Sequence, residues 1–369
     1  MNGYFTWPRG LAVALLVPMV ACAARASDLP RDEEMVFFNT SACLDPQGRN
    51  WLLPVHGWVF EPDEQSKVKA ATLEGLRRLL DIEPTPDELP VFRARAWPFL
   101  VENRSRREFS VRVGNRYFIL PKSESNGHIR QTIRLPVAEA DTLSLGREPT
   151  GRWIQFSLVT AEDDDREFAG WARLIAPRGL SVVSDIDDTI KITEVADHKE
   201  VLKNTFLRSF EAVPGMADVY RDWAESGAVF HYVSAGPWQL YAPLTEFQVR
   251  SGFPAGSFEL QPFRWKDKSA FNLFREPDSL KRPAIDALLA EFPLRRFIMV
   301  GDSGQRDPEM YAELYRRHPR QIARIYIRNV TRERRDGPRF LEAFAEVPPE
   351  IWRVFERAIE IERDELPKP

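Results

Sequence analysis

Two aspartates spaced two residues apart could carry out phosphoryl chemistry. Asp185 and Asp187 lie in SDIDDTIK (184–191), immediately after an apolar run that is typical of a buried strand. A carboxylate at the end of a strand can bind a hard cation and attack a phosphorus atom, and a second carboxylate beside it can protonate the leaving alkoxide. An isolated D-x-D is a common acidic turn, but D-x-D-x-T directly after an apolar strand, here ending in Thr189, is much more specific.

A second pair of aspartates could complete a metal site. Asp302 and Asp307 lie in GDSGQRDPEMY (301–311), after another apolar run. Mg²⁺ keeps several waters and takes few carboxylates, which suits one aspartate as a direct ligand and the other bound through water. Lys281 opens the preceding predicted helix, and a cation is needed at such a site because an attacking carboxylate and a phosphate repel each other.

A hydroxyl and the amides that follow it could hold phosphoryl oxygens. Ser234 ends an apolar run in VFHYVSAGPWQLY (229–241) and is followed by Ala235 and Gly236. Backbone N–H groups in such a place can bind anionic oxygens. A serine at the end of a strand is usually structural when taken alone. Here an acid pair, a hydroxyl, a lysine and a second acid pair follow in order, and all but the lysine come just after an apolar strand.

The elements that would position these residues alternate between short strands and helices. We predict strands over 180–184, 229–234, 296–301 and 322–327, and helices over about 214–226, 237–250, 281–291 and 307–317. This alternation is typical of an α/β fold in which helices cover both faces of a parallel sheet. Chemistry in such sheets lies at the carboxyl ends of the strands, so the residues above are expected to meet at one edge.

The chain from about 35 to 176 is instead rich in aromatic and β-branched residues. Its apolar runs often alternate with polar residues, and Gly114-Asn115 is a hairpin turn signal. We predict one helix within 63–82 and strands over 52–60, 92–101, 108–120, 129–136, 152–160 and 166–175. This pattern predicts a β-rich, sandwich-like accessory domain over 35–176, which could be a binding module or could buttress the second half.

The first 26 residues have the layout of a secretory signal peptide. Arg9 precedes the apolar run 11–24, which is too short to span a bilayer, and Ala-Arg-Ala at 24–26 fits a cleavage site. We therefore expect an exported protein, periplasmic or secreted. MVAC (19–22) also resembles a bacterial lipobox, which would instead place a lipid anchor on Cys22 and tether the chain to a membrane.

Composition excludes several classes of protein. Lys and Arg total 51 against 55 Asp and Glu, a net charge of −4, whereas nucleic-acid-binding proteins usually carry a basic excess. Two cysteines exclude a disulfide scaffold and an all-cysteine zinc site. At the other end of the chain, apolar residues at helical spacing within 349–364 predict a C-terminal amphipathic helix and tail, 347–369, packed on the domain.

The motifs together resemble the haloacid dehalogenase superfamily and, more narrowly, the phosphatidate phosphatase family of the actin patch protein type. The narrower match rests on SDIDDTIK, FHYVSAGPWQLY, the Lys281 helix, GDSGQRDPEMY, NTF (204–206), PGM (214–216) and YIRNV (326–330). The resemblance covers roughly 175–330. It implies a haloacid dehalogenase-like, Rossmann-like phosphatase domain over 177–346.

The resemblance also implies a role for each site residue. Asp185 would be the nucleophile that forms an aspartyl-phosphate, and Asp187 the general acid and then the base. Phosphate would be positioned by Thr189 and Ser234, and charge neutralised by Lys281. Mg²⁺ would be bound by Asp185, by the backbone carbonyl of Asp187 and by Asp302, with Asp307 behind it. The family hydrolyses phosphatidate to diacylglycerol and phosphate, so the implied partner is a phospholipid at a membrane surface.

Two features of the sequence bear on the reaction and the substrate. An Asp at position 187 can supply the proton that an ester leaving group needs, which favours a phosphatase over an ATPase or a dehalogenase. The segments 190–228 and 235–280 are too short for a full cap domain, and an open site suits large or membrane-embedded phosphoesters. The alternatives are a phosphatase for another large phosphoester, such as a phosphoprotein or a nucleic-acid end, and a lipid- or protein-binding module with a vestigial centre.

Overall fold

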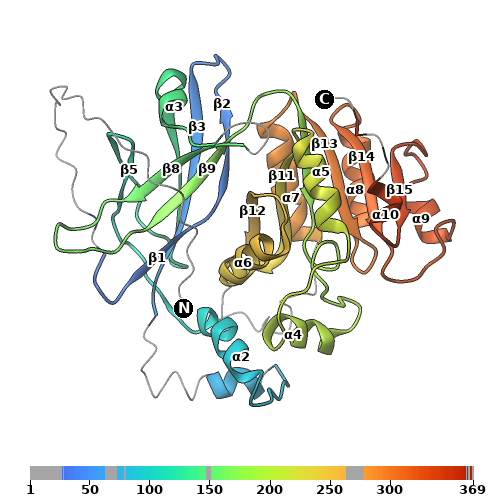
Figure 1. The fold of residues 1–369 in the computed structure, drawn as a ribbon, viewed down its shortest axis with the longest axis horizontal. Helices are drawn as coiled ribbons and strands as arrows, with labels where there is room; N and C mark the ends of the chain where they lie inside the picture. The colour runs from blue at the N-terminus through green and yellow to red at the C-terminus, as the bar shows by residue number, and fades with distance from the viewer. Residues whose placement is uncertain are drawn as a thin grey trace.

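The computed structural model of the chain describes residues 27, 29–62, 73–78, 80–146, 151–262, 278–362, 364 and 366–367. Figure 1 shows a β-rich part built from the first half of the chain beside an α/β part built from the second half. The predicted signal segment, Cys22, residues Val68 and Ala71 of the predicted 63–82 helix, and the loop 263–277 lie outside the described residues. No helix among the described residues is both long and apolar enough to cross a membrane.

The α/β part is a parallel sheet in the order β12-β11-β10-β13-β14-β15. Each neighbouring pair is parallel, which confirms the predicted α/β fold with a parallel sheet. The strands are β10 (Leu180–Ser184), β11 (Val229–Pro237), β12 (Gly256–Gln261), β13 (Arg296–Asp302), β14 (Ile322–Arg328) and β15 (Trp352–Phe355). The chain runs outward from β10 through β11 and β12 and then returns to β13 on its other side. The carboxyl ends of β10 and β13 therefore flank the point where the strand order reverses, where open α/β sheets bind ligands.

Helices connect these strands and cover the sheet (Figure 1). They are α4 (His198–Phe206), α5 (Met216–Glu225), α6 (Tyr241–Ser251), α7 (Asp278–Glu291), α8 (Asp307–Arg317), α9 (Pro338–Ala343) and α10 (Ile359–Glu362), with the short 3-10 helix η2 (Trp238–Leu240) before α6. Predicted helices at 214–226, 237–250, 281–291 and 307–317 are thus confirmed to within a few residues. Residues 190–228 contain the helices α4 and α5, and the segment 235–280 includes residues outside the described ones, so the lack of a cap domain stays a prediction.

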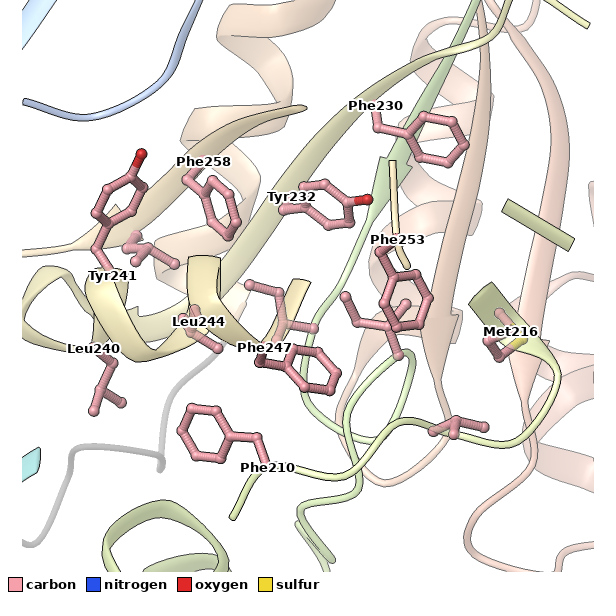
Figure 2. Packing of buried hydrophobic residues seen from close by; sticks show 14 of the residues in the cluster. Phe210, Met216, Phe230, Tyr232, Leu240, Tyr241, Leu244, Phe247, Phe253 and Phe258 are labelled. Atoms are coloured by element: carbon pink, nitrogen blue, oxygen red, sulfur yellow. The ribbon is translucent and has the colours of Figure 1, made fainter. Parts of the chain in front are cut away.

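Both faces of the parallel sheet are buried because successive strand residues point to opposite sides. Val182 and Phe230 pack into one apolar cluster, and their neighbours Val183 and Val229 pack into another. Figure 2 shows the first cluster, where aromatic rings from β11 and β12 meet the apolar face of α6. Burying each large apolar side chain contributes about 1.5–3 kcal/mol, so this packing fixes the strand ends that carry the aspartates.

The strands of the first half pair along the path β1-β3-β2-β9-β8-β5-β6, and β4 and β7 also pair with β3. They are β1 (Glu34–Phe37), β2 (Thr40–Leu44), β3 (Asn50–Glu61), β4 (Glu102–Asn103), β5 (Ser110–Val113), β6 (Arg116–Ile119), β7 (His128–Pro136), β8 (Arg152–Leu158) and β9 (Ala169–Leu174). The predicted hairpin is confirmed, since β5 and β6 pair antiparallel on either side of Gly114-Asn115. These strands confirm the β-rich character of this part. A separate apolar cluster forms its core, and a sandwich arrangement stays a prediction.

The two parts share a continuous core. Phe38 belongs to the same buried cluster as Trp238 and Tyr241, and its ring centroid lies 4.2 Å from that of Trp238. Next to it, the backbone N–H of Asn39 donates a hydrogen bond of 2.9 Å to the hydroxyl of Tyr241. Trp238 and Tyr241 follow Ser234 closely in the chain. The β-rich part therefore packs against the segment that leads out of the predicted phosphate-binding turn.

Two sequence predictions were wrong. The segment 92–101, predicted as a strand, forms helix α2 (Leu89–Ala96) followed by the 3-10 helix η1 (Trp97–Phe99). A proline stands in the first turn of α2, which favours a helix start. Its buried Phe92 and Ala96 are four residues apart and pack together in the shared core, a spacing that the apparent two-residue alternation concealed.

The predicted amphipathic helix over 349–364 is also absent. Residues Trp352–Phe355 form β15, which pairs parallel with β14, and among the described residues of 349–364 the helical ones are Ile359–Glu362, as α10. Without β15 the backbone groups of β14 would form an open sheet edge, which a protein normally covers or pairs. Strand pairing with a distant segment therefore outweighed the local helical spacing. The remaining predicted tail is described only at residues 364, 366 and 367 beyond α10.

Candidate active site

Asp185 lies directly beyond the carboxyl end of β10, the central strand, and is fixed by a lysine and a threonine. Its backbone N–H continues the sheet by donating to the carbonyl of Val300 on β13. Its carboxylate Oδ1 lies 2.7 Å from Lys281 Nζ, and its Oδ2 accepts a hydrogen bond of 3.1 Å from the hydroxyl of Thr189. Asp185 and Lys281 are each about 1% exposed. The sequence predicted all three residues for this site, and the structure brings them into direct contact.

Asp302 and Asp307 complete what we call the acid cluster, which is Asp185, Asp302, Asp307 and Lys281. One carboxylate oxygen from each of the three aspartates lies within 4.8 Å of the others. Lys281 Nζ also contacts Asp307 Oδ1 at 3.0 Å and Gln305 Oε1 at 2.8 Å. Asp302 Oδ1 accepts hydrogen bonds from the N–H groups of Gly304 and Gln305. The other oxygen, Asp302 Oδ2, is buried without a hydrogen-bond partner among the described residues.

The charges of the acid cluster suit a divalent cation. Three buried carboxylates against one ammonium leave a formal excess of two negative charges. Oxygen ligands are those that Mg²⁺ prefers, and the unpartnered Oδ2 of Asp302 is an available donor to a metal. The residues present are therefore compatible with a bound divalent cation such as Mg²⁺ among Asp185, Asp302 and Asp307.

The pKa values express the same charge imbalance. Burial raises the pKa of Asp185 to about 7, with Lys281 opposing the shift and the charge of Asp307 adding to it. Burial likewise raises the pKa of Asp302 well above its usual range, and the neighbouring aspartates add to this shift. Burial disfavours the charged form of Lys281, but the surrounding carboxylates outweigh it and raise its pKa, so Lys281 stays protonated. A cation bound among these oxygens would favour their ionised forms.

Asp187 is held separately from the acid cluster, by a group of donors that we call the Asp187 clamp: Lys191, Thr193 and Ser234. Lys191 Nζ and the Thr193 hydroxyl both lie 2.8 Å from Asp187 Oδ1. The hydroxyl of Ser234, at the carboxyl end of β11, donates to Asp187 Oδ2 at 3.1 Å. Burial alone would raise the pKa of Asp187, but Lys191 and the two hydroxyls overcome it and lower that pKa.

The turn that carries the clamp is built by Asp188. Its side chain accepts hydrogen bonds from the backbone N–H groups of Thr193, Glu194 and Val195. Asp188 has a φ of 55°, in the left-handed region that aspartate tolerates better than most residues. Arg328 at the end of β14 donates to the Asp188 carbonyl at 2.6 Å. These contacts fix the residues after Asp187 in a loop that returns Thr193 to the carboxylate.

The predicted phosphate-binding residues lie beside both groups. Ser234 connects the predicted phosphate-binding residues to the Asp187 clamp. Its hydroxyl accepts a hydrogen bond of 2.9 Å from the N–H of Gly236 and donates one to Asp187. Ala235 and Gly236 belong to the last residues of β11 and are buried at the same edge of the sheet. The structure therefore gathers every residue that the sequence proposed for the site, while their individual roles stay predictions.

The loop after β13 is shaped by close packing and by an arginine. A side chain at Gly301 would collide with Asp307, so glycine is required for Asp307 to reach back to β13. Arg339 on α9 donates to the carbonyls of Ser303 and Gln305, both at 2.6 Å. This arginine holds the loop that presents Asp302 and Gln305.

A cavity of about 400 Å³ lies elsewhere, between the β-rich part and the edge of the parallel sheet. Its lining comes from strands β2, β3, β7 and β12 and from α7, and none of the predicted site residues is among them. The chemistry-bearing residues therefore lie outside this cavity, at the carboxyl edge of the sheet.

Lys191, Thr193, Asp188 and Gln305 were missed by the sequence interpretation. Lys191 stands in the same SDIDDTIK motif, four residues after Asp187, which was the available signal. The role of Asp188 depends on a left-handed backbone conformation, and that of Gln305 on the course of a loop, which the pattern of residue types does not reveal.

The segment that carries this site is similar to a described family of catalytic domains. Residues 180–329 match the family described as "Phosphatidate phosphatase APP1, catalytic domain". The chain is 32% identical over 171 residues to the "Phosphatidate phosphatase APP1" of Saccharomyces cerevisiae, covering 45% of this chain and 29% of that protein. It is 31% identical over 156 residues to an uncharacterized protein of Schizosaccharomyces pombe, covering 41% of this chain and 25% of that protein. The chain thus spans under a third of the length of the curated relatives it matches.

Similarity to solved structures is weak. A sialyltransferase from Photobacterium damsela aligns at 11% identity with a TM-score of 0.21, covering 66% of this chain and 45% of that one. A β-glucuronidase from Parabacteroides merdae aligns at 10% identity with a TM-score of 0.25, covering 80% and 35% of the two chains. Scores this low carry no argument about fold or function.

Proposed function

We propose that this protein is a Mg²⁺-dependent phosphatidate phosphatase, because residues 180–329 match the family described as "Phosphatidate phosphatase APP1, catalytic domain". We further propose that its α/β part is a haloacid dehalogenase-like phosphatase domain. The observation that carries the proposal is the contact of Asp185 with Lys281 inside the acid cluster, at the carboxyl edge of the matched sheet. A nucleophile, a cation and a metal-binding set converge there.

The proposed reaction begins with Asp185. One of its carboxylate oxygens forms a bond to the phosphorus of the phosphomonoester, and the bond between phosphorus and the ester oxygen breaks. In the substrate complex, where the negative charge of the phosphate would raise the pKa of Asp187, the protonated Asp187 gives its proton to the departing alkoxide, which leaves as diacylglycerol. Lys281 offsets the repulsion between the carboxylate and the phosphate.

The second half of the reaction regenerates the enzyme. Asp187, now deprotonated, removes a proton from a water molecule that attacks the phosphorus of the aspartyl-phosphate, which releases phosphate and restores the Asp185 carboxylate. Thr189, Ser234 and the amides of Ala235 and Gly236 would orient the phosphoryl oxygens. When bound, Mg²⁺ supplies positive charge against which the phosphate can be placed, and Asp185, the Asp187 backbone carbonyl and Asp302 would hold it.

The complete set of side chains supports an active enzyme over a vestigial centre, because Asp185, Asp187 and Lys281 are all present, with Asp185 in contact with Lys281 and Asp187 paired with Lys191. The segment 186–215, which holds only the nine-residue helix α4, supports a large substrate such as a phospholipid. Export through residues 1–26, or a lipid anchor at Cys22, stays a prediction. Either would place the substrate in an outward-facing or foreign membrane.

Phosphate release from the purified protein tests the proposal. The substrates are phosphatidate in mixed micelles, a soluble aryl phosphate, a phosphopeptide and a 5′-phosphorylated oligonucleotide, each with Mg²⁺ and with a chelator. We expect Mg²⁺-dependent release from phosphatidate that the Asp185→Asn variant lacks. Release from the peptide or the oligonucleotide in place of phosphatidate would keep the chemistry and contradict the substrate. No release from any of them would contradict the enzyme assignment.

A further inference from the structure

We propose that Lys191, together with Thr193, positions the Asp187 carboxyl for proton transfer, and that helix α2 of the β-rich part supports this arrangement through Phe210. This inference rests on the proposed function, because it assumes that Asp187 exchanges a proton with the leaving group and with water. It assigns a positioning role to two residues outside the nucleophile, the metal ligands and the phosphate turn, and it gives the β-rich part a task in the reaction.

The backbone brings Lys191 to Asp187. The N–H of Lys191 donates to the carbonyl of Ile186, and the carbonyl of Lys191 accepts from the N–H of Asp188 at 2.7 Å. This tight turn places residues 187 and 191 side by side as an isolated bridge. The ion pair between their side chains is therefore set by local backbone geometry, and the long lysine side chain does not need to search for its partner.

Burial makes the lysine dependent on this partner. Lys191 is about 2% exposed, and its ammonium also donates to the hydroxyl of Thr193. A buried ammonium is costly unless it is paired and hydrogen-bonded, so Lys191 is held at the carboxylate and not in solvent. Lys191 and Thr193 fix Asp187 Oδ1, Ser234 fixes Oδ2, and the carboxyl plane has one orientation.

Phe210 connects Lys191 to the β-rich part. Lys191 Nζ lies 4.8 Å from the centroid of the Phe210 ring, and the guanidinium carbon of Arg95 lies 3.6 Å from the same centroid. Both distances fit cation–π contacts. Arg95 belongs to α2 and donates to the carbonyl of Thr205 on α4 at 2.6 Å. Figure 2 shows Phe210 next to Phe247 of α6, and the two ring centroids are 6.1 Å apart.

The arrangement makes a prediction that a purely structural role would not make. A misaligned Asp187 should slow the first step for substrates whose leaving group needs a proton and should affect that step less for substrates whose leaving group does not. The diagnostic quantity is the ratio of kcat/KM for an alkyl phosphate such as phosphatidate to kcat/KM for an activated aryl phosphate, because kcat/KM does not include hydrolysis of the shared aspartyl-phosphate. General acid catalysis contributes about 10²–10⁴-fold, so losing its alignment leaves room for a large change in this ratio.

The experiment compares Lys191→Met, Lys191→Arg and Thr193→Val with wild type and with Lys199→Met. Lys199 is an exposed lysine on α4 and serves as the matched control. We expect Lys191→Met to lower the alkyl-to-aryl ratio about 10- to 100-fold, Thr193→Val to lower it less, and Lys199→Met to leave it unchanged. Partial recovery of the ratio in Lys191→Arg would support positioning by a cation. An unchanged ratio in both Lys191→Met and Thr193→Val would overturn the proposal.

Two further variants test the connections on either side of Lys191. In an Asp187→Asn background, Lys191→Met should not lower the ratio again, because Lys191 acts through Asp187; an additional drop would contradict the proposal. Arg95→Gln should lower the ratio in the same direction by about threefold, as a remote contact does. An unchanged ratio in Arg95→Gln would remove α2 from the arrangement.

A stability measurement keeps the test independent of activity. Lys191→Met leaves a buried carboxylate without its cation and should lower the midpoint of thermal unfolding, whereas Asp187→Asn with Lys191→Met should recover much of that loss. Absence of this recovery would overturn the pairing even if wild type released phosphate from neither substrate. If wild type releases phosphate from neither substrate but the double variant recovers its unfolding midpoint, the proposed function is contradicted and the Lys191–Asp187 pairing is supported.

Discussion

The acid cluster and the Asp187 clamp lie side by side, and in each a buried aspartate is paired with a buried lysine. The pKa values of these two aspartates, Asp185 and Asp187, nevertheless shift in opposite directions. Burial and two neighbouring carboxylates raise the pKa of Asp185 to about 7 although Lys281 is 2.7 Å away. Lys191 and two hydroxyls lower the pKa of Asp187 in spite of its burial. One lysine cannot balance the negative charge of three carboxylates, whereas one lysine and two hydroxyls stabilise the single carboxylate of Asp187. The charge of the acid cluster is thus compatible with an additional cation, and the Asp187 clamp needs none.

The largest expected effect is at Asp185, the proposed nucleophile. Asp185→Asn should lower kcat by about 10⁴-fold or more on every substrate, because the carboxylate oxygen that attacks phosphorus is gone. Phosphate release and circular dichroism measured together would separate loss of chemistry from loss of fold. Activity within tenfold of wild type on a well-folded variant would mean that Asp185 is not the nucleophile.

A smaller and substrate-dependent effect is expected at the clamped aspartate. Asp187→Asn should lower kcat/KM for phosphatidate about 10²–10⁴-fold and should lower kcat/KM for an activated aryl phosphate much less, because only the alkoxide that leaves phosphatidate needs a proton. The measurement is kcat/KM on both substrates with the same enzyme preparation. Equal losses on the two substrates would argue against a general-acid role for Asp187, and the variant would then resemble Asp185→Asn.

Mg²⁺ should stabilise the protein through the acid cluster alone. At a concentration 100 times its dissociation constant, a ligand that binds the folded state raises the free energy of unfolding by about 2.7 kcal/mol. We expect this gain in wild type and in Lys191→Met, and a much smaller gain in Asp302→Asn, measured by chemical denaturation with Mg²⁺ and with a chelator. If Asp302→Asn kept the full gain, the metal would have to bind elsewhere.

A further expected effect is a dependence of stability on pH. An unfolded aspartate titrates near pH 3.9, and Asp185 in the folded state near 7, so between these values the folded state binds more protons. The free energy of unfolding of the metal-free protein should therefore fall as pH rises from about 4 to 7, by at most about 1.4 kcal/mol per pH unit for this group.

The clamped aspartate should behave in the opposite way. The pKa of Asp187 is lowered, so its contribution to stability is present above pH 3.9 and is lost only as pH falls through its folded pKa. Denaturation in chelator at pH 5 and pH 7 would measure the slope, with exposed Asp222→Asn as the matched control for Asp185→Asn. The slope should be shallower in Asp185→Asn and unchanged in Asp222→Asn. An unchanged slope in both would assign it to another group.

Much of the α/β part could be predicted from the sequence because its strands are short apolar runs with polar residues at their ends. The predicted strand over 180–184 is β10, and the predicted helix over 307–317 is α8. Prediction failed where a distant partner decided the local structure. The segment 92–101 became helical because it packs in the shared core, and residues 352–355 became a strand because β14 offered an edge to pair with.

The sequence by itself determined which residues could do chemistry and in what order they occur, since an aspartate at the end of an apolar strand is a local feature. Tertiary structure decided their electrostatics. The pKa of a carboxylate depends on how many charges and donors surround it in a buried space. For Asp185 those come from Lys281, Asp307 and Asp187, and for Asp187 they come from Lys191, Thr193 and Ser234. Two aspartates that the sequence presents as near equivalents are therefore made different by neighbours up to 122 positions away, because Coulomb interaction and desolvation act through space.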